Sequence, residues 1–308
     1  QQFKQLLMTS GFDRYFQIAP CFRDEDARAD RSPGEFYQLD MEMAFASQED
    51  VFAVLEDVLP PVFEKFGTYK TASKAPFCRI SYKDAMEKYG TDKPDLRIDL
   101  LVQDATECMA DCGFGPFEGN VVKAVVADGF KGTRKVIDKL CADVEVQAGN
   151  KAYWFKVDEN GALTGGISKF LQKHAEAVKE ALGLKPGDFV GVCAGKKQAA
   201  QKTAGVLRRY IGALAEGHMK TDCYEFCWIV DFPMYEIGEE SGELEFCHNP
   251  FSMPQGGMDA LNNQDPLSIN AYQYDLVCNG VELSSGAVRN HDPEIMVKAF
   301  QIVGLGED

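Results

Sequence analysis

Two acidic side chains flank a tight turn near the end of the sequence. Asn279-Gly280 separates two short apolar runs and predicts a two-residue type I′ β-hairpin. The turn pairs Asp275 with Ser284, so Asp275 and Glu282 fall diagonally adjacent on one face. Paired carboxylates are costly without a cation, and Mg²⁺ prefers one or two carboxylates plus substrate phosphates. The spacing indicates a candidate Mg-ATP site, while a solvent-exposed acid pair stays open as the alternative.

Near the start of the sequence, acidic and basic side chains share one face of a predicted strand pair. The polar residues of this face are Arg23, Glu25, Gln38, Asp40 and Glu42, and the loop adds Arg28 and Arg31. A guanidinium binds phosphate oxygens in a bidentate manner, and a mobile loop can close over a triphosphate. The face therefore suits a ligand with phosphate and amine groups. A solvated network of salt bridges is the simpler alternative.

Alternating polarity predicts the strands that carry this face. Residues 15–23 and residues 36–45 each alternate, which is typical of half-buried strands, and they form an antiparallel pair around a polar loop at 26–35. The apolar side of the first strand consists of Phe16, Ile18 and Phe22.

A helix is expected directly after these strands. A Ser47-x-x-Asp50 capping pattern opens it, and Pro60-Pro61 is expected to interrupt it. Its predicted inner stripe consists of Val51, Val54, Leu55 and Val58.

The middle of the sequence differs in character from both ends. Gly-rich and Val-rich segments alternate from about residue 110 to 220, and we interpret residues 109–221 as a domain inserted between residues 1–108 and 222–308. A helix is predicted in its later part, with an apolar stripe at Ala204, Leu207, Ile211 and Leu214 and a stop at Gly217. After it, residues 228–233 again predict a strand, followed by the terminal hairpin and a helix.

Composition limits the class of protein. The chain has 308 residues, 45% hydrophobic and 26% charged, with no apolar run long enough to span a bilayer. Ten scattered Cys favour a reducing cytoplasm over a disulfide framework. The net charge of -16 taken alone argues against nucleic-acid binding. With four His and no nucleophile elbow, a histidine-based hydrolase is poorly supported, and the segment 191–197 is one residue short of a P-loop.

Several motifs resemble one family in the right order. The segment from Cys21-Phe-Arg-Asp-Glu-Asp-Ala-Arg-Ala-Asp-Arg31 to Gly34-Glu-Phe-Tyr-Gln-Leu-Asp40 resembles motif 2 of the aspartyl branch of class II aminoacyl-tRNA synthetases. Further matching segments are Gln1-Gln-Phe-Lys-Gln-Leu-Leu7, Asp92-Lys-Pro-Asp-Leu-Arg97, Trp228-Ile-Val-Asp-Phe-Pro-Met234, His248-Asn-Pro-Phe-Ser252 and Asn279-Gly-Val-Glu-Leu-Ser-Ser-Gly-Ala-Val-Arg289. The inserted region is similar to the extra domain of the bacterial subtype. The resemblance implies an α+β fold, in which an antiparallel six- or seven-stranded class II sheet flanked by helices is interrupted by an inserted α+β domain.

The same resemblance implies roles for individual residues. The catalytic set is Arg23, Glu25, Asp275 and Glu282, of which Asp275 and Glu282 hold Mg²⁺. The ATP-binding set is Arg23, Glu25, Arg31, Phe36 and Glu282, with Arg23 on the α-phosphate and Phe36 stacked on adenine. The aspartate-binding set is Gln1, Lys4, Arg23, Gln38, Asp40, His248 and Arg289, with Lys4 and Arg289 on the substrate side chain. Arg289 falls on the opposite strand parity from Glu282, so we expect a bulge or kink near Gly286.

The expected function is ATP-dependent activation of L-aspartate and its transfer to the 3′ end of tRNA-Asp. Charging of tRNA-Asn as well is an alternative that the sequence leaves open. An asparaginyl-type ligase is the related alternative, and the insertion and the Lys4/Arg289 pair disfavour it. A non-catalytic paralogue would be expected to have lost some of the catalytic residues, and all are present. We also expect a chain cut short at both ends, without the dimer-forming motif 1, motif 3 and the anticodon-binding barrel, from a cytoplasmic homodimer with no membrane association.

Overall fold

The computed structural model describes residues 2–22, 34–238 and 241–306. The chain forms two compact units: unit 1 is Gln1–Val62 with Lys74–Pro76, and unit 2 is Phe63–Ser73 with Phe77–Asp308. Each unit is described by itself. No helix among the described residues is long and apolar enough to cross a membrane.

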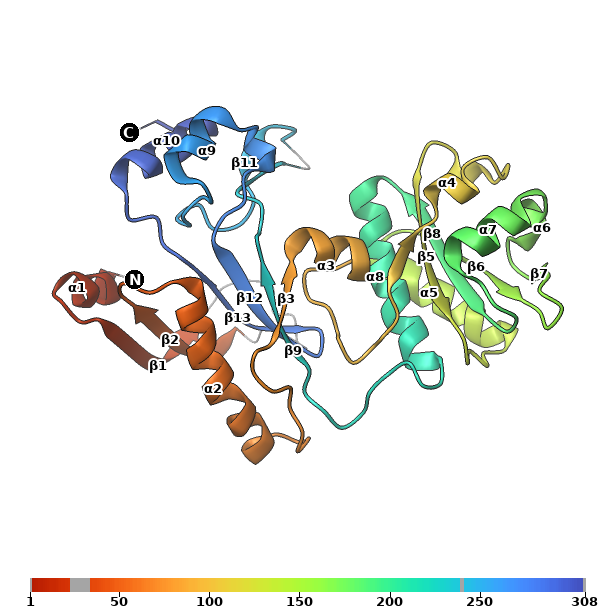
Figure 1. Cartoon of the computed structure of the whole chain (residues 1–308), viewed down its shortest axis with the longest axis horizontal. Helices are drawn as coiled ribbons and strands as arrows, with labels where there is room; N and C mark the ends of the chain where they lie inside the picture. Colours follow the sequence, from red (N-terminus) through yellow and green to blue (C-terminus); the bar gives the residue numbers. More distant parts are fainter. Residues whose placement is uncertain (1, 23–33, 239–240, 307–308) are drawn as a thin grey trace. The chain divides into compact units, whose positions relative to one another are not determined.

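Unit 1 is built around one antiparallel strand pair (Figure 1). Its elements are α1 (Gln2–Thr9), β1 (Arg14–Phe22), β2 (Glu35–Met43) and most of α2 (Gln48–Phe66). The register pairs Cys21 with Phe36 and Gln17 with Asp40, which confirms the predicted hairpin. The predicted burial is wrong for the apolar side: Phe16 is 70% and Phe22 72% exposed, because the described residues do not cover that face.

The helix α2 begins as predicted but does not break at its prolines. Asp50 accepts hydrogen bonds from the backbone N–H and hydroxyl of Ser47. The helix continues through Pro60 and Pro61 to Phe66. Its last turn packs on a distant part of the chain, since the ring of Phe63 lies edge-on to that of Tyr224 at 4.9 Å. Tertiary packing of this turn outweighs the local cost of the prolines.

The inner stripe of α2 also differs from the prediction. Leu55 is buried, but Val54 and Val58 are exposed, and the buried positions are instead Phe52 and Glu56 beside Leu55. The helical period was right and its phase was wrong, because the sequence did not show which side the rest of the fold covers.

Unit 2 contains a four-stranded sheet in the order β13-β12-β9-β3. Its strands are β3 (Cys78–Ser81), β9 (Phe226–Val230), β12 (Gln273–Cys278) and β13 (Val281–Ala287). The pairs β9–β12 and β12–β13 are antiparallel, while β3–β9 is parallel. A parallel pair needs a crossover connection, and the whole segment between β3 and β9 supplies it. The α+β class is confirmed, but the described sheet has fewer strands than expected and is not wholly antiparallel.

Smaller elements surround this sheet. They are α3 (Tyr82–Tyr89), β10 (Tyr235–Ile237), β11 (Leu244–Phe246), α9 (Gly257–Asn263), η3 (Pro266–Ser268) and α10 (Pro293–Ile302). In the turn between β12 and β13, Asn279 has φ 51° and Gly280 has φ 81°, as the predicted type I′ hairpin requires.

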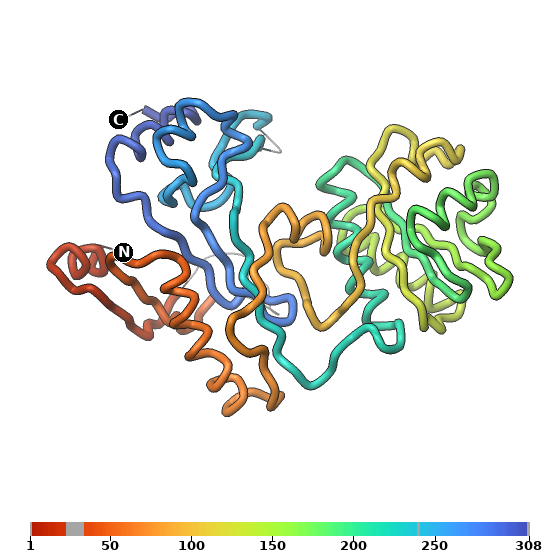
Figure 2. The backbone as a smooth tube through the Cα atoms, viewed as in Figure 1, coloured from red at the N-terminus to blue at the C-terminus, as the bar shows by residue number. Residues whose placement is uncertain are grey.

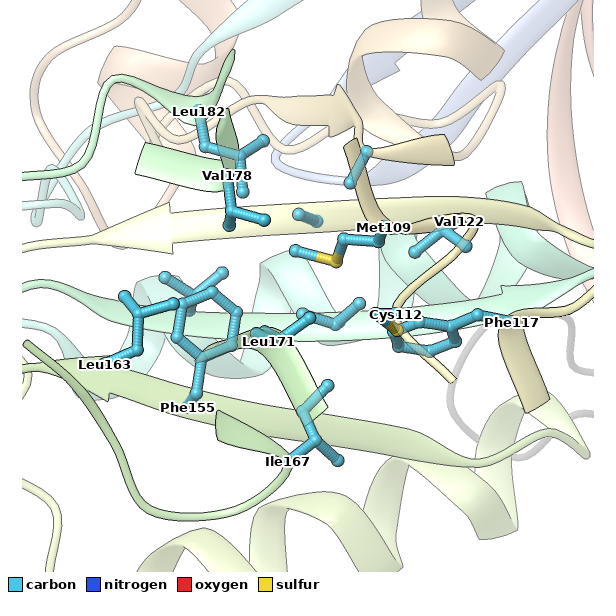
Figure 3. Close-up of a cluster of buried hydrophobic side chains, with 14 of the residues drawn as sticks. Met109, Cys112, Phe117, Val122, Phe155, Leu163, Ile167, Leu171, Val178 and Leu182 are labelled. Carbon is cyan, nitrogen blue, oxygen red and sulfur yellow. The ribbon is translucent and has the colours of Figure 1, made fainter. Parts of the chain in front are cut away.

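A five-stranded antiparallel sheet forms within the crossover. Its spatial order is β4 (Val102–Asp104), β5 (Val121–Ala127), β8 (Phe189–Gly195), β6 (Ala152–Val157) and β7 (Leu163–Thr164). Successive residues of β8 alternate between two cores: Val190 and Val192 pack in one, Phe189 and Cys193 in the other. The first core, drawn in Figure 3, joins the sheet to α4 (Thr106–Met109), η1 (Gly115–Phe117), α6 (Ser168–Leu171) and α7 (Ala175–Leu182). The short helix η2 (Gln172–His174) connects α6 to α7. The second core joins the sheet to α5 (Arg134–Ala148) and α8 (Lys197–Leu214), so helices cover both faces.

The chain enters and leaves this five-stranded region through two paired segments, which can be followed in Figure 2. The N–H of Asp99 donates to the carbonyl of His218, and that of Lys220 to the carbonyl of Arg97. The buried guanidinium of Arg208 on α8 donates to three main-chain carbonyls of the entering segment, those of Asp95, Ile98 and Leu100. Two of the glycines, Gly90 and Gly205, allow the end of α3 to touch α8 directly.

Gly90 gives a test of this close approach. It caps α3 at φ 68°, and a Cβ there would collide with the backbone of Gln201 and Gly205. Gly183 caps α7 at φ 63° with open space around it, so it is a matched control. We expect Gly183→Ala to lower the free energy of unfolding by about 1 kcal/mol and Gly90→Ala by about 2–4 kcal/mol, measured by urea titration. Equal losses would mean that the α3–α8 contact is not tight.

Candidate functional site

In unit 1, the predicted polar face of the strand pair forms a mixed-charge cluster. Lys4 Nζ lies 3.1 Å from Asp40 Oδ1 and 2.7 Å from Glu42 Oε1. The side-chain amides of Gln17 and Gln38 each donate to Asp40 at 3.4 Å. Three of the predicted aspartate-binding residues, Lys4, Gln38 and Asp40, are thus brought together.

The ion pairs of this cluster favour the charged form of Lys4. Burial alone would lower the pKa of Lys4, but its hydrogen bonds to Glu42 and Asp40 outweigh burial and raise that pKa. The ring of Phe36 shares this face by register, because it occupies the same strand side as Gln38 and Asp40. A ligand with both an ammonium and a carboxylate group matches such alternating charges.

In unit 2, the terminal hairpin brings Asp275 and Glu282 to one face, as predicted. The exact register differs, because Asp275 pairs with Ser285 rather than Ser284. A β-bulge between Leu276 and Val277 adds one residue to β13 and causes this shift. Val277 still pairs with Glu282, so the two acids keep the same side of the sheet.

The bulge also changes the parity of the residues that follow it. Ser285 and Ala287 now lie on the same face of the sheet as Asp275. This is the face that Arg289 was expected to share with the acid pair. The expected irregularity exists, but it follows Glu282 directly instead of lying near Gly286. Arg289 itself lies beyond the end of β13, is exposed, and its backbone pairs with that of Ser252.

Asp275 is in a poorly solvated environment, whereas Glu282 is exposed. Burial, followed by repulsion from Glu282, raises the pKa of Asp275 to about 7. Lys93 acts in the opposite direction, and Asp92 adds further repulsion. Two hard oxygen donors that repel each other suit Mg²⁺, which completes its coordination with waters and phosphates. In the part of the chain that the structure describes, no group of three or more His, Cys, Asp and Glu side chains is arranged to hold a metal.

His248 stands against aromatic rings in unit 2. Its ring lies edge-on to Phe232, with centroids 5.0 Å apart, and more distantly to Tyr82 at 6.3 Å. Burial raises the pKa of Tyr82 to about 12, so its hydroxyl stays protonated near neutral pH. His248 is exposed, and the two rings fix one side of it.

Lys93 is a residue of this site that sequence reasoning did not assign. Its ammonium lies 2.7 Å from Asp92 Oδ2 and 3.3 Å from Glu282 Oε2. It belongs to the Asp92–Arg97 motif that carries part of the family resemblance, and that motif was the available signal. The local pattern did not show that this segment contacts the terminal hairpin.

Four of the predicted site residues lie outside the described residues. They are Gln1, Arg23, Glu25 and Arg31. The charged cluster around Asp40 in unit 1 and the acid pair in unit 2 are described as two separate sites.

Comparison with known proteins places the chain in a family. The family described as "tRNA synthetases class II (D, K and N)" matches residues 1–308, and the chain belongs to this family. The "Aspartate--tRNA ligase" of Streptomyces coelicolor is 55% identical over 307 residues, which are 99% of this chain and 52% of that protein. The "Aspartate--tRNA(Asp/Asn) ligase" of Acidiphilium cryptum is 54% identical over 318 residues, covering 100% and 53%. The chain therefore spans about half the length of the curated relatives it matches.

A solved structure, "Aspartyl tRNA synthetase from Entamoeba histolytica", is similar at 17% identity with a TM-score of 0.41. The similarity covers 98% of this chain and 40% of that chain.

The raised pKa of Asp275 predicts a pH effect on stability. A carboxyl group whose pKa rises from 3.8 to about 7 on folding stabilises the protein fully below pH 3.8, and that stability is lost as pH rises through 7. Asp275→Asn has no such loss. We expect its stability relative to wild type to increase by about 1–3 kcal/mol between pH 4.5 and 8 in EDTA, measured by urea unfolding. The exposed Glu243→Gln serves as the control, and parallel profiles for wild type and Asp275→Asn would contradict the prediction.

Proposed function

We propose that this chain is the catalytic region of an enzyme that activates L-aspartate with ATP and transfers it to the 3′ end of tRNA-Asp. The main support is 55% identity over 99% of the chain to an aspartate--tRNA ligase. Membership of the family and the two charged clusters agree with this proposal. Whether tRNA-Asn is a second acceptor is open, because relatives with both printed specificities are about equally similar.

The first chemical step needs positioning and charge neutralisation, with no protein nucleophile. The aspartate α-carboxylate attacks the α-phosphorus of ATP, a P–O bond to the leaving group breaks, and pyrophosphate departs to leave aspartyl-adenylate. In the second step a ribose hydroxyl of the tRNA attacks the acyl carbon and AMP leaves. Asp275 and Glu282 would hold Mg²⁺, which would neutralise phosphate charge when bound.

The proposed ATP contacts of the phosphates and the adenine come from the segment that resembles motif 2. Arg23 would bind the α-phosphate and the substrate carboxylate, and Arg31 the γ-phosphate, because a guanidinium matches phosphate oxygens in a bidentate manner. Glu25 would accept a hydrogen bond from the adenine amine, and Phe36 would stack on the ring. These roles follow from the motif that the sequence shares with the family.

Aspartate selection rests on charge. Lys4 and Arg289 would bind the substrate side-chain carboxylate, and a neutral asparagine amide would leave these cations unpaired. Asp40 and Glu42 orient Lys4 by direct ion pairs. Gln1, Gln38 and Asp40 would bind the substrate amino group, and His248 would close the pocket.

The domain organisation is also part of the proposal. Residues 1–108 and 222–308 would form the catalytic domain, and residues 109–221 the inserted one. The five-stranded sheet with helices on both faces supports a separate folding unit in the crossover, although its first strand starts at Val102. The complete protein would be a cytoplasmic homodimer.

Amino-acid-dependent isotope exchange tests this function in the natural full-length protein. We expect exchange of pyrophosphate into ATP with aspartate but not with asparagine, since two cations need an anionic side chain. Arg23→Ala should reduce the rate by at least about 10³-fold through loss of the α-phosphate contact. Lys139→Ala, an exposed change in an i,i+4 ion pair on α5, is the control and should leave the rate unchanged. Exchange that depends on asparagine, or full activity after the Arg23 change, would refute the assignment.

A further inference from the structure

One ammonium group faces three carboxylates near the turn of the terminal hairpin. Lys93 Nζ forms ion pairs with Asp92 and Glu282, and it is close enough to Asp275 to oppose the repulsion there. Among the described residues, Lys93 is the cation that forms ion pairs in this patch of three carboxylates, Asp92, Asp275 and Glu282. Its side chain is 29% exposed, so the patch is shielded more than a typical surface salt bridge.

The segment that carries Lys93 is fixed from both sides. Two residues further on, Asp95 accepts two hydrogen bonds from the guanidinium of Arg97, at 3.0 and 2.7 Å. The main-chain carbonyl of Asp95 accepts a third from Arg208 on α8 at 3.1 Å. On the hairpin side, a Cβ added to Gly280 would lie 3.4 Å from Asp95 and 3.7 Å from the carbonyl of Lys93. The turn of the hairpin therefore packs directly on this segment.

Such a fixed ammonium and a divalent cation would compete for the same oxygens. A carboxylate pair without a counter-cation repels itself and loses its common orientation. A lysine held by a rigid segment prevents this at little cost, because it binds as a point charge and can withdraw on its flexible stem when a stronger cation arrives.

We propose that Lys93 is a positioning residue that holds Glu282 and Asp275 ready for Mg²⁺ and is displaced from Glu282 when the metal binds. The assignment of these two acids to Mg²⁺ rests on the proposed function. Lys93 acts through the acids and takes no part in bond making. The Asp92–Arg97 segment thereby gains a role in the active site, and α8 supports that role through Arg208.

The test uses Mg²⁺ alone and the natural full-length protein without nucleotide. Lys93→Met keeps the length of the stem and removes the charge, Lys93→Arg keeps the charge, and Lys88→Met removes an exposed lysine from α3 as a matched control. Thermal melting is followed as Mg²⁺ is added. We expect Lys93→Met to respond at an about tenfold lower Mg²⁺ concentration than wild type, because the competing ammonium is gone. Lys93→Arg and Lys88→Met should respond like wild type.

A second readout separates positioning from general stability. In aspartate-dependent exchange at saturating Mg²⁺, the two acids of Lys93→Met lack the ammonium that holds their common orientation. The KM for ATP should therefore rise several-fold more than kcat falls, and Lys93→Arg should restore most of the loss. If Lys93→Met does not melt cooperatively, Lys93→Gln replaces it in both measurements. The inference would be overturned if Lys93→Met responded at the same Mg²⁺ concentration as wild type. It would also be overturned if Lys88→Met showed the same shift to lower Mg²⁺ concentration as Lys93→Met.

The two proposals fail in different ways. Wild-type protein without aspartate-dependent exchange would refute the proposed function, whatever the Mg²⁺ titration gives. A normal exchange rate in wild type together with equal Mg²⁺ responses in wild type and Lys93→Met would refute only the role of Lys93.

Discussion

The guanidinium of Arg208 is the contact on which unit 2 depends most. It is 2% exposed, and burial lowers its pKa, so the charge is tolerated only because three carbonyls and the ring of Tyr89, 4.9 Å away, satisfy it. Through it, the helix α8 holds the segment that leaves α3. The chain can then build a five-stranded sheet and still return to place β9 beside β3.

The candidate metal site follows from that arrangement. Once the segment around Asp95 is fixed, Lys93 reaches the carboxylates of the terminal hairpin, although the two elements are far apart in sequence. Without this cation the exposed Glu282 would repel Asp275, whose carboxyl group is poorly solvated. In unit 1, Lys4 has a similar relation to Asp40 and Glu42. Among the described residues of both units, an ammonium group balances neighbouring acids, so the net charge of -16 says little about these local sites.

Features encoded by neighbouring residues were predictable. The Asn279-Gly280 turn fixed the hairpin and put Asp275 beside Glu282, because positive φ at two positions selects one turn type. The alternation in β1 and β2 gave their pairing. Two predictions from local sequence were wrong. The helix α2 runs through Pro60, and the bulge follows Glu282 instead of lying near Gly286. Both depend on packing partners that a local pattern does not contain.

The sequence by itself determined the family motifs, and the resemblance they carry implied the α+β class. It also determined the acid pair, since turn chemistry, periodicity and side-chain type act over a few residues. Only the tertiary structure decided that β3 lies parallel to β9, that helices cover both faces of the five-stranded sheet, and that Lys93 meets Glu282. The physical reason is that these contacts join segments separated by long stretches of chain. Their free energy comes from burial and charge balance between elements, and no local propensity specifies which elements meet.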